Sequence, residues 1–195
     1  MEAPSTTTLV ADFASGRREA FRDLYRRVAP RLYVWCALRI PQALHARIDP
    51  DDLMQEVWLR CVRTMPKFDR SVAAFRTWLF GIAANTLAEN LRNLNVRRRE
   101  QVLESPDAGL DRIPADVTSV IGTVARREQA RRLVAACRDL PADDLRLLIH
   151  RGLEELPHAE VARLLDIGPE AAEMRWRRLQ KKLQHEWASA GLGET

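Results

Sequence analysis

Apolar and polar residues alternate with helical spacing along most of the chain, and the pattern is clearest over residues 52–65. One side of this predicted helix is apolar and is expected to be core: Met54, Val57, Trp58, Cys61 and Met65. Asp49 and Pro50 form a typical helix start, because the carboxylate caps free N–H groups and proline is tolerated in the first turn. Pro66 ends the helix, since the residue before a proline avoids the α region.

The opposite side of the same helix is polar and acidic around a single apolar residue. Its members are Asp52, Gln55, Glu56, Leu59 and Arg63. Leu59 is either a stray leucine on a solvated face or the centre of a contact surface, and periodicity alone leaves both readings open.

A second helix is predicted from about Phe75, with a broad apolar face made of Phe75, Leu79, Ile82, Ala83 and Thr86. One flank carries Trp78, Asn85, Glu89 and Arg92. A tryptophan, an amide and an arginine on one edge could stack on unpaired bases and hydrogen-bond to them. The alternative is that Trp78 is core and the others are merely solvated.

The flanking segments follow the same helical pattern. Residues 1–11 are expected to be disordered, and a helix is expected from about Asp12 to Ile40, kinked or divided by Pro30. Its exposed side carries arginines that serve either solubility or phosphate contact. These are Arg17, Arg18, Arg22, Arg26 and Arg27.

After Arg92 the composition changes to a linker rich in proline, glycine and acids, and helices resume near Arg126. Residues 166–168 form a tight turn between two helices, the second of which begins at Pro169, and this arrangement is a helix-turn-helix. Val161, Leu164 and Leu165 are expected to pack inward, as is the stripe Ala172, Trp176, Leu179, Leu183 and Trp187. Glu170, Met174, Arg177, Arg178 and Lys181 are expected to face outward.

Composition narrows the class of protein. The net charge of +4 permits nucleic-acid binding without requiring it, and no apolar run approaches the ~20 residues of a membrane span. No secretory signal begins the chain, and the three cysteines are widely separated, which favours reduced thiols in a cytoplasmic protein. No nucleophile motif, Gly-rich phosphate loop or metal-ligand spacing occurs, so we expect no enzyme activity, no metal and no cofactor.

The segment DDLMQEVWLR, then KF, then FRTWLFGIAANT closely resembles conserved region 2 of bacterial RNA polymerase sigma factors of the extracytoplasmic-function (ECF) group. The C-terminal segments AEVARLL and RWRRL resemble sigma region 4, which reads the −35 promoter element. Two departures stand out in this second match. Glu155 occupies a position where a glycine usually ends the preceding helix, and Glu173 puts negative charge where the family usually has Lys or Arg.

The resemblance implies an all-α fold of two small helical domains joined by a flexible linker. Region 2 would span residues 12–97, the linker 98–125 and the region 4 helix-turn-helix 126–187. The implied function is that of a dissociable polymerase subunit that directs promoter-specific transcription initiation. The implied partners are the RNA polymerase core (β′ clamp and β flap) and promoter DNA, with an anti-sigma factor as a further candidate.

The resemblance also assigns sites. Asp52, Gln55, Glu56 and Leu59 would bind core polymerase. The −10 element would contact Phe68, Trp78, Ile82, Asn85, Glu89 and Arg92, with Phe68 and residues 69–74 forming a pocket for one flipped base. The −35 element would contact Arg175, Arg177, Arg178 and Lys181.

Two alternatives remain at this point. One is a stand-alone helix-turn-helix regulator that uses only residues 130–187 and binds DNA without polymerase. The other is a degenerate sigma-like protein that acts through protein partners, which Glu170 and Glu173 would favour.

Overall fold

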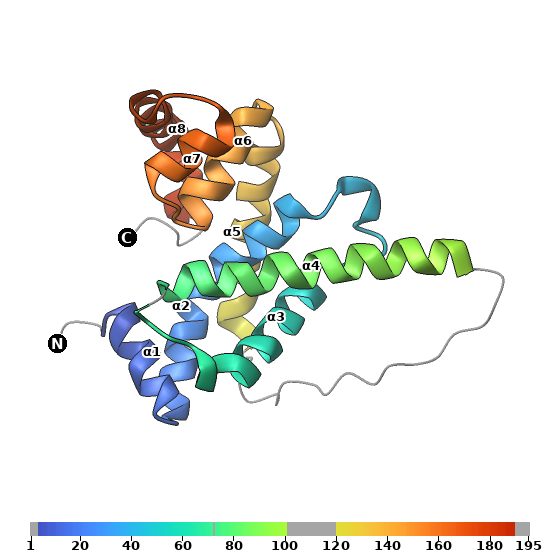
Figure 1. Ribbon diagram of the computed structural model, residues 1–195, viewed down its shortest axis with the longest axis vertical. Coiled ribbons are helices and arrows are strands. Elements are labelled where there is room, and N and C mark those ends of the chain that lie inside the picture. The colour runs from blue at the N-terminus through green and yellow to red at the C-terminus, as the bar shows by residue number, and fades with distance from the viewer. Residues whose placement is uncertain (1–3, 72, 101–119, 190–195) are drawn as a thin grey trace.

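A computed structural model describes residues 4–71, 73–100 and 120–189, and every regular element in these ranges is helical (Figure 1). The helices are α1 Thr6–Ala14, α2 Arg18–Arg39, α3 Pro50–Thr64, α4 Phe75–Glu100, α5 Val120–Arg138, α6 Ala142–Leu147, α7 His158–Leu165 and α8 Pro169–Ser189. Shorter pieces are the 3-10 turns η1 Gln42–Leu44 and η2 Met65–Lys67 and the π-helical η4 Leu148–Leu153. The prediction of an all-α fold is confirmed.

The N-terminal segment is helical, so the prediction of disorder over residues 1–11 is wrong from Thr6 onward. Ser5 caps α1 by accepting a hydrogen bond at Oγ from the Thr8 amide at 3.1 Å. Leu9 and Val10 are almost fully buried. A helix this short is marginal in isolation, so packing on α2 stabilises it. Tertiary burial, rather than local periodicity, decides the conformation here.

Helix α2 continues through Pro30, so the expected division at this residue does not occur. A proline removes one backbone donor, and the helix tolerates the loss where its neighbours are well packed. Val28 and Leu32 on either side are fully buried. The break in this region lies earlier, at Gly16, whose φ of 90° separates α1 from α2.

Helix α3 begins and ends where the sequence predicts. Asp49 Oδ1 accepts a hydrogen bond from the Asp51 amide at 2.7 Å, and Pro50 is the first helical residue. The helix ends at Thr64, just before Met65 and Pro66. All five predicted core residues of this stretch are buried, and so is Leu53, which the pattern did not assign.

The C-terminal half contains the predicted helix-turn-helix. Asp166 lies between α7 and α8 with a left-handed φ of 55°, and α8 begins at Pro169. Leu164 is 43% exposed, so its predicted inward position is wrong. Neighbouring helical residues point about 100° apart, and Leu165 takes the inward direction. Ala172, Trp176, Leu179 and Leu183 are buried as predicted, while the Trp187 side chain lies outside the described residues.

Helical structure also enters both ends of the predicted linker. Helix α4 extends to Glu100, and α5 begins at Val120, earlier than the expected restart near Arg126. Residues 101–119, which make up the rest of that linker, lie outside the described residues.

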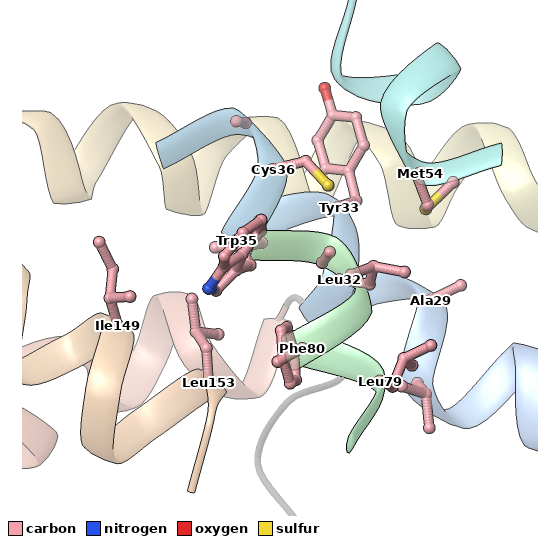
Figure 2. Close-up of a cluster of buried hydrophobic side chains, with 14 of the residues drawn as sticks. Ala29, Leu32, Tyr33, Trp35, Cys36, Met54, Leu79, Phe80, Ile149 and Leu153 are labelled. Atoms are coloured by element: carbon pink, nitrogen blue, oxygen red, sulfur yellow. The ribbon is translucent and has the colours of Figure 1, made fainter. Parts of the chain in front are cut away.

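The two halves pack against each other and share one hydrophobic core, an arrangement that the sequence did not predict. Helix α2 of the N-terminal half contacts both α5 and η4 of the C-terminal half. Figure 2 shows Trp35 of α2 beside Phe80 of α4 on one side and Ile149 and Leu153 of η4 on the other. Trp35 is fully buried by these neighbours.

Candidate functional site

The outward face of α3 keeps the composition that the sequence predicts. Asp52 and Gln55 are exposed, whereas Glu56 and Leu59 are half-buried. These four side chains follow helical spacing, since the opposite face of α3 is anchored in the core by Trp58. The face therefore presents an apolar centre with a polar and acidic rim, which is the usual composition of a protein-binding surface.

Glu56 has a second role that the sequence did not show. Its Oε1 accepts a hydrogen bond from Arg60 at 2.6 Å, and its Oε2 accepts one from Asn90 of α4 at 3.0 Å. Arg60 also pairs with Glu89 of α4 at 2.7 Å. Hydrogen bonding to Glu89, together with the charge of Glu56, raises the pKa of Arg60, and Arg60 in turn lowers the pKa of Glu89. This network ties α3 to α4.

The flank of α4 that was predicted to meet DNA is partly accessible. Asn85 and Arg92 are exposed, whereas Trp78, Ile82 and Glu89 are half-buried. Glu89 is paired with Arg60. Trp78 packs against the core, as the alternative reading expected, while Asn85 and Arg92 face outward, and contact of this flank with bases stays a prediction.

Phe68 precedes α4 and Trp78 lies within it, and their aromatic rings pack against each other. Their ring centroids are 4.8 Å apart, and Phe75 completes an aromatic cluster at 5.9 Å from each. The loop after Phe68 is shaped by Asp69, whose carboxylate accepts hydrogen bonds from the Ser71 amide at 2.8 Å and hydroxyl at 2.7 Å. These bonds lower the pKa of Asp69. The cluster thus fixes the edge of α4 against the loop.

A cavity of about 490 Å³ lies beside this loop. It is lined by α1, the loop, the start of α4 and one residue of the C-terminal half: Thr6, Thr7, Val10, Phe68, Arg70, Ala73, Ala74, Phe75, Arg76 and Glu155. Among the residues that the structure describes, Ile82 and Asn85 are not part of this lining. The cavity therefore shares Phe68 and the loop after it with the predicted base pocket, but not Ile82 or Asn85.

Helix α8 carries the predicted −35 residues, and they fall into two groups. Arg175 turns toward α6, where it pairs with Asp144 at 2.6 Å and Asp143 at 3.4 Å. The hydrogen bond to Asp144 is the main reason that the pKa of Arg175 is raised. Arg177, Arg178 and Lys181 are exposed.

Glu173, the acidic departure from the family pattern, pairs with Arg177 at 2.6 Å, at i,i+4 spacing on α8. Glu170 and Met174 are exposed on the same outward side. The surface of α8 that remains free of acidic partners within the described residues is therefore centred on Arg178 and Lys181.

Metal and thiol chemistry find no support in the described part of the chain. No group of three or more His, Cys, Asp or Glu side chains is arranged there to hold a metal ion. Cys36, Cys61 and Cys137 are buried and not disulfide-bonded, and burial raises the pKa of Cys61 to about 12. No described helix is long and apolar enough to cross a membrane.

Sequence reasoning missed a set of side chains that join the two halves. Trp35 Nε1 donates a hydrogen bond to Glu154 Oε1 at 2.7 Å, and Glu155 forms ion pairs with Arg31 and Arg76. The available signals were the i,i+4 spacing of Arg31 and Trp35 and the acidic residue at the glycine position. Neither signal identifies a partner without the tertiary structure.

The sequence of this chain is similar to those of known proteins of one family. A family model for sigma-70 region 2 matches residues 24–97. The ECF RNA polymerase sigma factor SigD of Mycobacterium tuberculosis is 26% identical over 98% of this chain and 88% of its own. CarQ of Myxococcus xanthus, an RNA polymerase sigma factor, is 27% identical over 88% and 91%. The ECF sigma-E factor of Escherichia coli is 27% identical over 81% of each chain.

Among solved structures, CnrH in complex with the cytosolic domain of CnrY matches 91% of this chain and 93% of that chain, with 22% identity and a TM-score of 0.45. The sequence matches place the chain among the RNA polymerase sigma factors. Within them it belongs to the ECF group, since relatives of that group align over 98% and 81% of the chain.

Proposed function

We propose that this ECF sigma factor docks on core RNA polymerase through α3, opens promoter DNA with α4 and the loop before it, and reads the upstream promoter element with α8. The nucleotidyl transfer itself belongs to the polymerase, and the protein acts beside it in the cytoplasm. The observation that carries the proposal is the outward face of α3, where Asp52 and Gln55 surround the half-buried Leu59.

The α3 face would bind the β′ clamp of the core. An acidic rim speeds encounter and sets register, whereas an apolar centre supplies buried area and most of the affinity. Among the described residues, Asp52 and Leu59 form no interhelical hydrogen bond like that of Glu56 to Asn90, so they can be changed with less effect on the fold. Contact of the C-terminal half with the β flap, and control by an anti-sigma factor, extend the same proposal.

The test replaces Asp52→Lys together with Leu59→Asp and measures co-purification with core polymerase. We expect the double variant to lose binding while its thermal unfolding stays cooperative. Asp23→Lys, the same charge reversal at an exposed position of α2, is the matched control and should bind as wild type does. Retention of core binding by the double variant would remove α3 as the docking face.

DNA opening is assigned to the aromatic cluster and the α4 flank. Removing a base from the stack costs a few kcal/mol, and stacking on an aromatic ring with hydrogen bonds to the base edge can offset that cost. Trp78 is half-buried against Phe68, and Asn85 is exposed about two turns further along α4. For −35 binding, Arg177, Arg178 and Lys181 are exposed on α8. Arg175, paired with two aspartates, would contribute mainly by orienting α8 on α6.

A further inference from the structure

Three elements of the C-terminal half meet beside the first turn of α7. The π-helical η4 ends at Leu153, α7 begins at His158, and α8 packs against both η4 and α7. His158 lies at this junction and is half-buried. The charged groups that face it are Arg151 of η4 and Glu173 and Arg177 of α8. A histidine therefore lies among two cations and one acid at the start of the helix-turn-helix.

The hydrogen bonds of His158 fix its protonation state in this structure. Arg151 Nε donates to His158 Nε2 at 3.2 Å, so Nε2 supplies the lone pair and the ring proton lies on Nδ1. Nδ1 is buried and has no hydrogen-bond partner among the described residues. Arg151 is held in place by a second bond, from Nη1 to the Leu156 carbonyl at 3.3 Å. The imidazole is neutral here, since Nε2 cannot bind a proton while it accepts from a guanidinium.

The surroundings of His158 also disfavour its charged form. Burial lowers the pKa of this imidazole, and the positive charges of Arg151 and Arg177 lower it further, while the negative charge of Glu173 acts in the opposite direction. The net result is a pKa below the ordinary value of 6.5. Glu173 is itself paired with Arg177 at 2.6 Å, which reduces the negative field that it exerts on the ring. His158 is therefore neutral in the free protein at neutral pH.

A phosphate at this junction would reverse the balance. In a helix-turn-helix the first helix crosses the DNA backbone while the second lies in the major groove. Those helices are α7 and α8 here, so the start of α7 would lie beside a DNA strand. A phosphate would draw the Arg151 guanidinium into a charge-assisted hydrogen bond and so free the Nε2 lone pair of His158. The negative charge of the phosphate would also favour the imidazolium form.

We propose that DNA binding by the C-terminal half is coupled to the uptake of one proton at His158 Nε2, with Arg151 and the protonated ring sharing one backbone phosphate. The proton comes from solvent, and no bond between heavy atoms forms or breaks. His158 thus supplies a positive charge only when DNA is bound. The inference rests on the proposed function, because it assumes that α8 enters the major groove of duplex DNA.

The sign of the pH dependence follows from this coupling. A group whose pKa is higher in the complex than in the free protein takes up a proton on association, so the affinity rises as the pH falls between the two pKa values. Uptake of one proton makes binding tighter by at most about tenfold for each unit of pH. The range from about pH 8 to about pH 6 includes the ordinary titration of histidine and lies above that of carboxyl groups.

The test measures binding of the full chain to a labelled mixed-sequence duplex by fluorescence anisotropy, over this pH range and at constant ionic strength. The gain in affinity of the wild type on acidification should exceed that of His158→Gln by about fivefold. His158→Lys carries a permanent charge, so at the upper pH it should bind about as tightly as the wild type does at the lower pH. The lysine variant separates a lost charge from a folding defect.

His45→Gln is the matched control, because it removes a histidine of the N-terminal half and changes no residue of the helix-turn-helix. Its pH profile should match that of the wild type. A second measurement follows the Cε1 proton resonance of His158 by NMR, identified by its absence in His158→Gln. The titration midpoint of this resonance should lie at higher pH with the duplex than without it.

The proposal is overturned if His158→Gln gains as much affinity on acidification as the wild type does, or if the duplex leaves the midpoint of His158 unchanged. It is also overturned if the wild type binds the duplex equally well across the pH range, although the DNA role of α8 would then remain. Absence of duplex binding at every pH would defeat that role in the proposed function as well. The two failures are therefore distinguishable.

Discussion

At the scale of single residues, the backbone of Glu155 adopts a conformation that its residue type disfavours. Glu155 and Asp166 are the non-glycine residues with positive φ in the part of the chain that the structure describes. Asp166 is a short polar residue at a helix end, where this conformation is common. Glu155 has no such local reason, and its ion pairs with Arg31 and Arg76 offset the backbone cost.

The backbone cost at Glu155 can be measured apart from its charge. Glu155→Gly and Glu155→Ala both remove the carboxylate, but only alanine keeps the strain. We expect the glycine variant to be more stable by about 1 kcal/mol in urea unfolding. At Arg163, an exposed position within α7, the order should reverse, with alanine more stable than glycine by a similar amount. Equal stabilities of the two variants at Glu155 would show that its conformation carries no cost.

Asn85 tests the assignment of DNA opening at the same scale. It is exposed on α4, so Asn85→Ala should leave the fold intact. We expect reduced open-complex formation on duplex promoters and a much smaller loss on pre-melted templates, because pre-melting has already supplied the unstacking energy. Permanganate reactivity of unpaired thymines measures the opening. A similar loss on both templates would point to damaged folding instead.

Elements were predictable where their signals are local. The start of α3 at Asp49–Pro50, its end before Pro66 and the turn at Asp166 all follow from capping, proline and turn chemistry. Helix α1 was missed because its stability comes from burial of Leu9 and Val10, which a Ser/Thr-rich sequence does not show. The outward positions of Asp52 and Gln55 follow from the same local periodicity, but the pairing of Arg175 with α6 depends on tertiary packing.

Helix α8 is the second helix of the helix-turn-helix, and its charges allow a prediction about DNA binding. Glu173 neutralises Arg177 at 2.6 Å, so Glu173→Arg both releases Arg177 and adds a cation. Binding of the full chain to duplex DNA should strengthen, and the salt dependence should steepen by about one to two phosphate contacts. Glu128→Arg, on the exposed side of α5, controls for net charge and should have a smaller effect. Collapse of binding to a preferred sequence would mean that Glu173 reads a base directly.

At the scale of the whole molecule, the main difference from the sequence prediction is that the N-terminal and C-terminal halves pack against each other. The sequence predicted two domains separated by a linker, and nothing in α2 alone indicated that the face of Arg31 and Trp35 would meet η4. Such contacts join residues more than a hundred positions apart, as Trp35 and Glu154 do. Periodicity identifies a buried face but not its partner.

Packing of the two halves against each other should depend on pH, because Glu154 accepts a hydrogen bond from Trp35 across their contact. Burial by itself raises the pKa of this carboxyl, but hydrogen bonds from His150 and Trp35 outweigh it, and the net shift is downward. A depressed pKa contributes stability above the unfolded value of about 4.3 that is lost as the pH falls through the folded pKa. The radius of gyration from X-ray scattering should therefore rise on acidification below about pH 4.

In Glu154→Gln this pH response should be weaker, because the amide does not titrate. Glu160→Gln serves as the control and should respond as wild type does. An unchanged response in Glu154→Gln would assign the acid sensitivity to other carboxyls.

The account as a whole depends on the protein directing initiation by RNA polymerase. The most direct measurement is run-off transcription with purified core polymerase on a library of promoter fragments, with and without this protein. We predict discrete transcripts from a subset of fragments only when the protein is present, and their loss with Asp52→Lys, Leu59→Asp. Absence of protein-dependent transcripts from every fragment, with a folded protein and active core, would contradict the account.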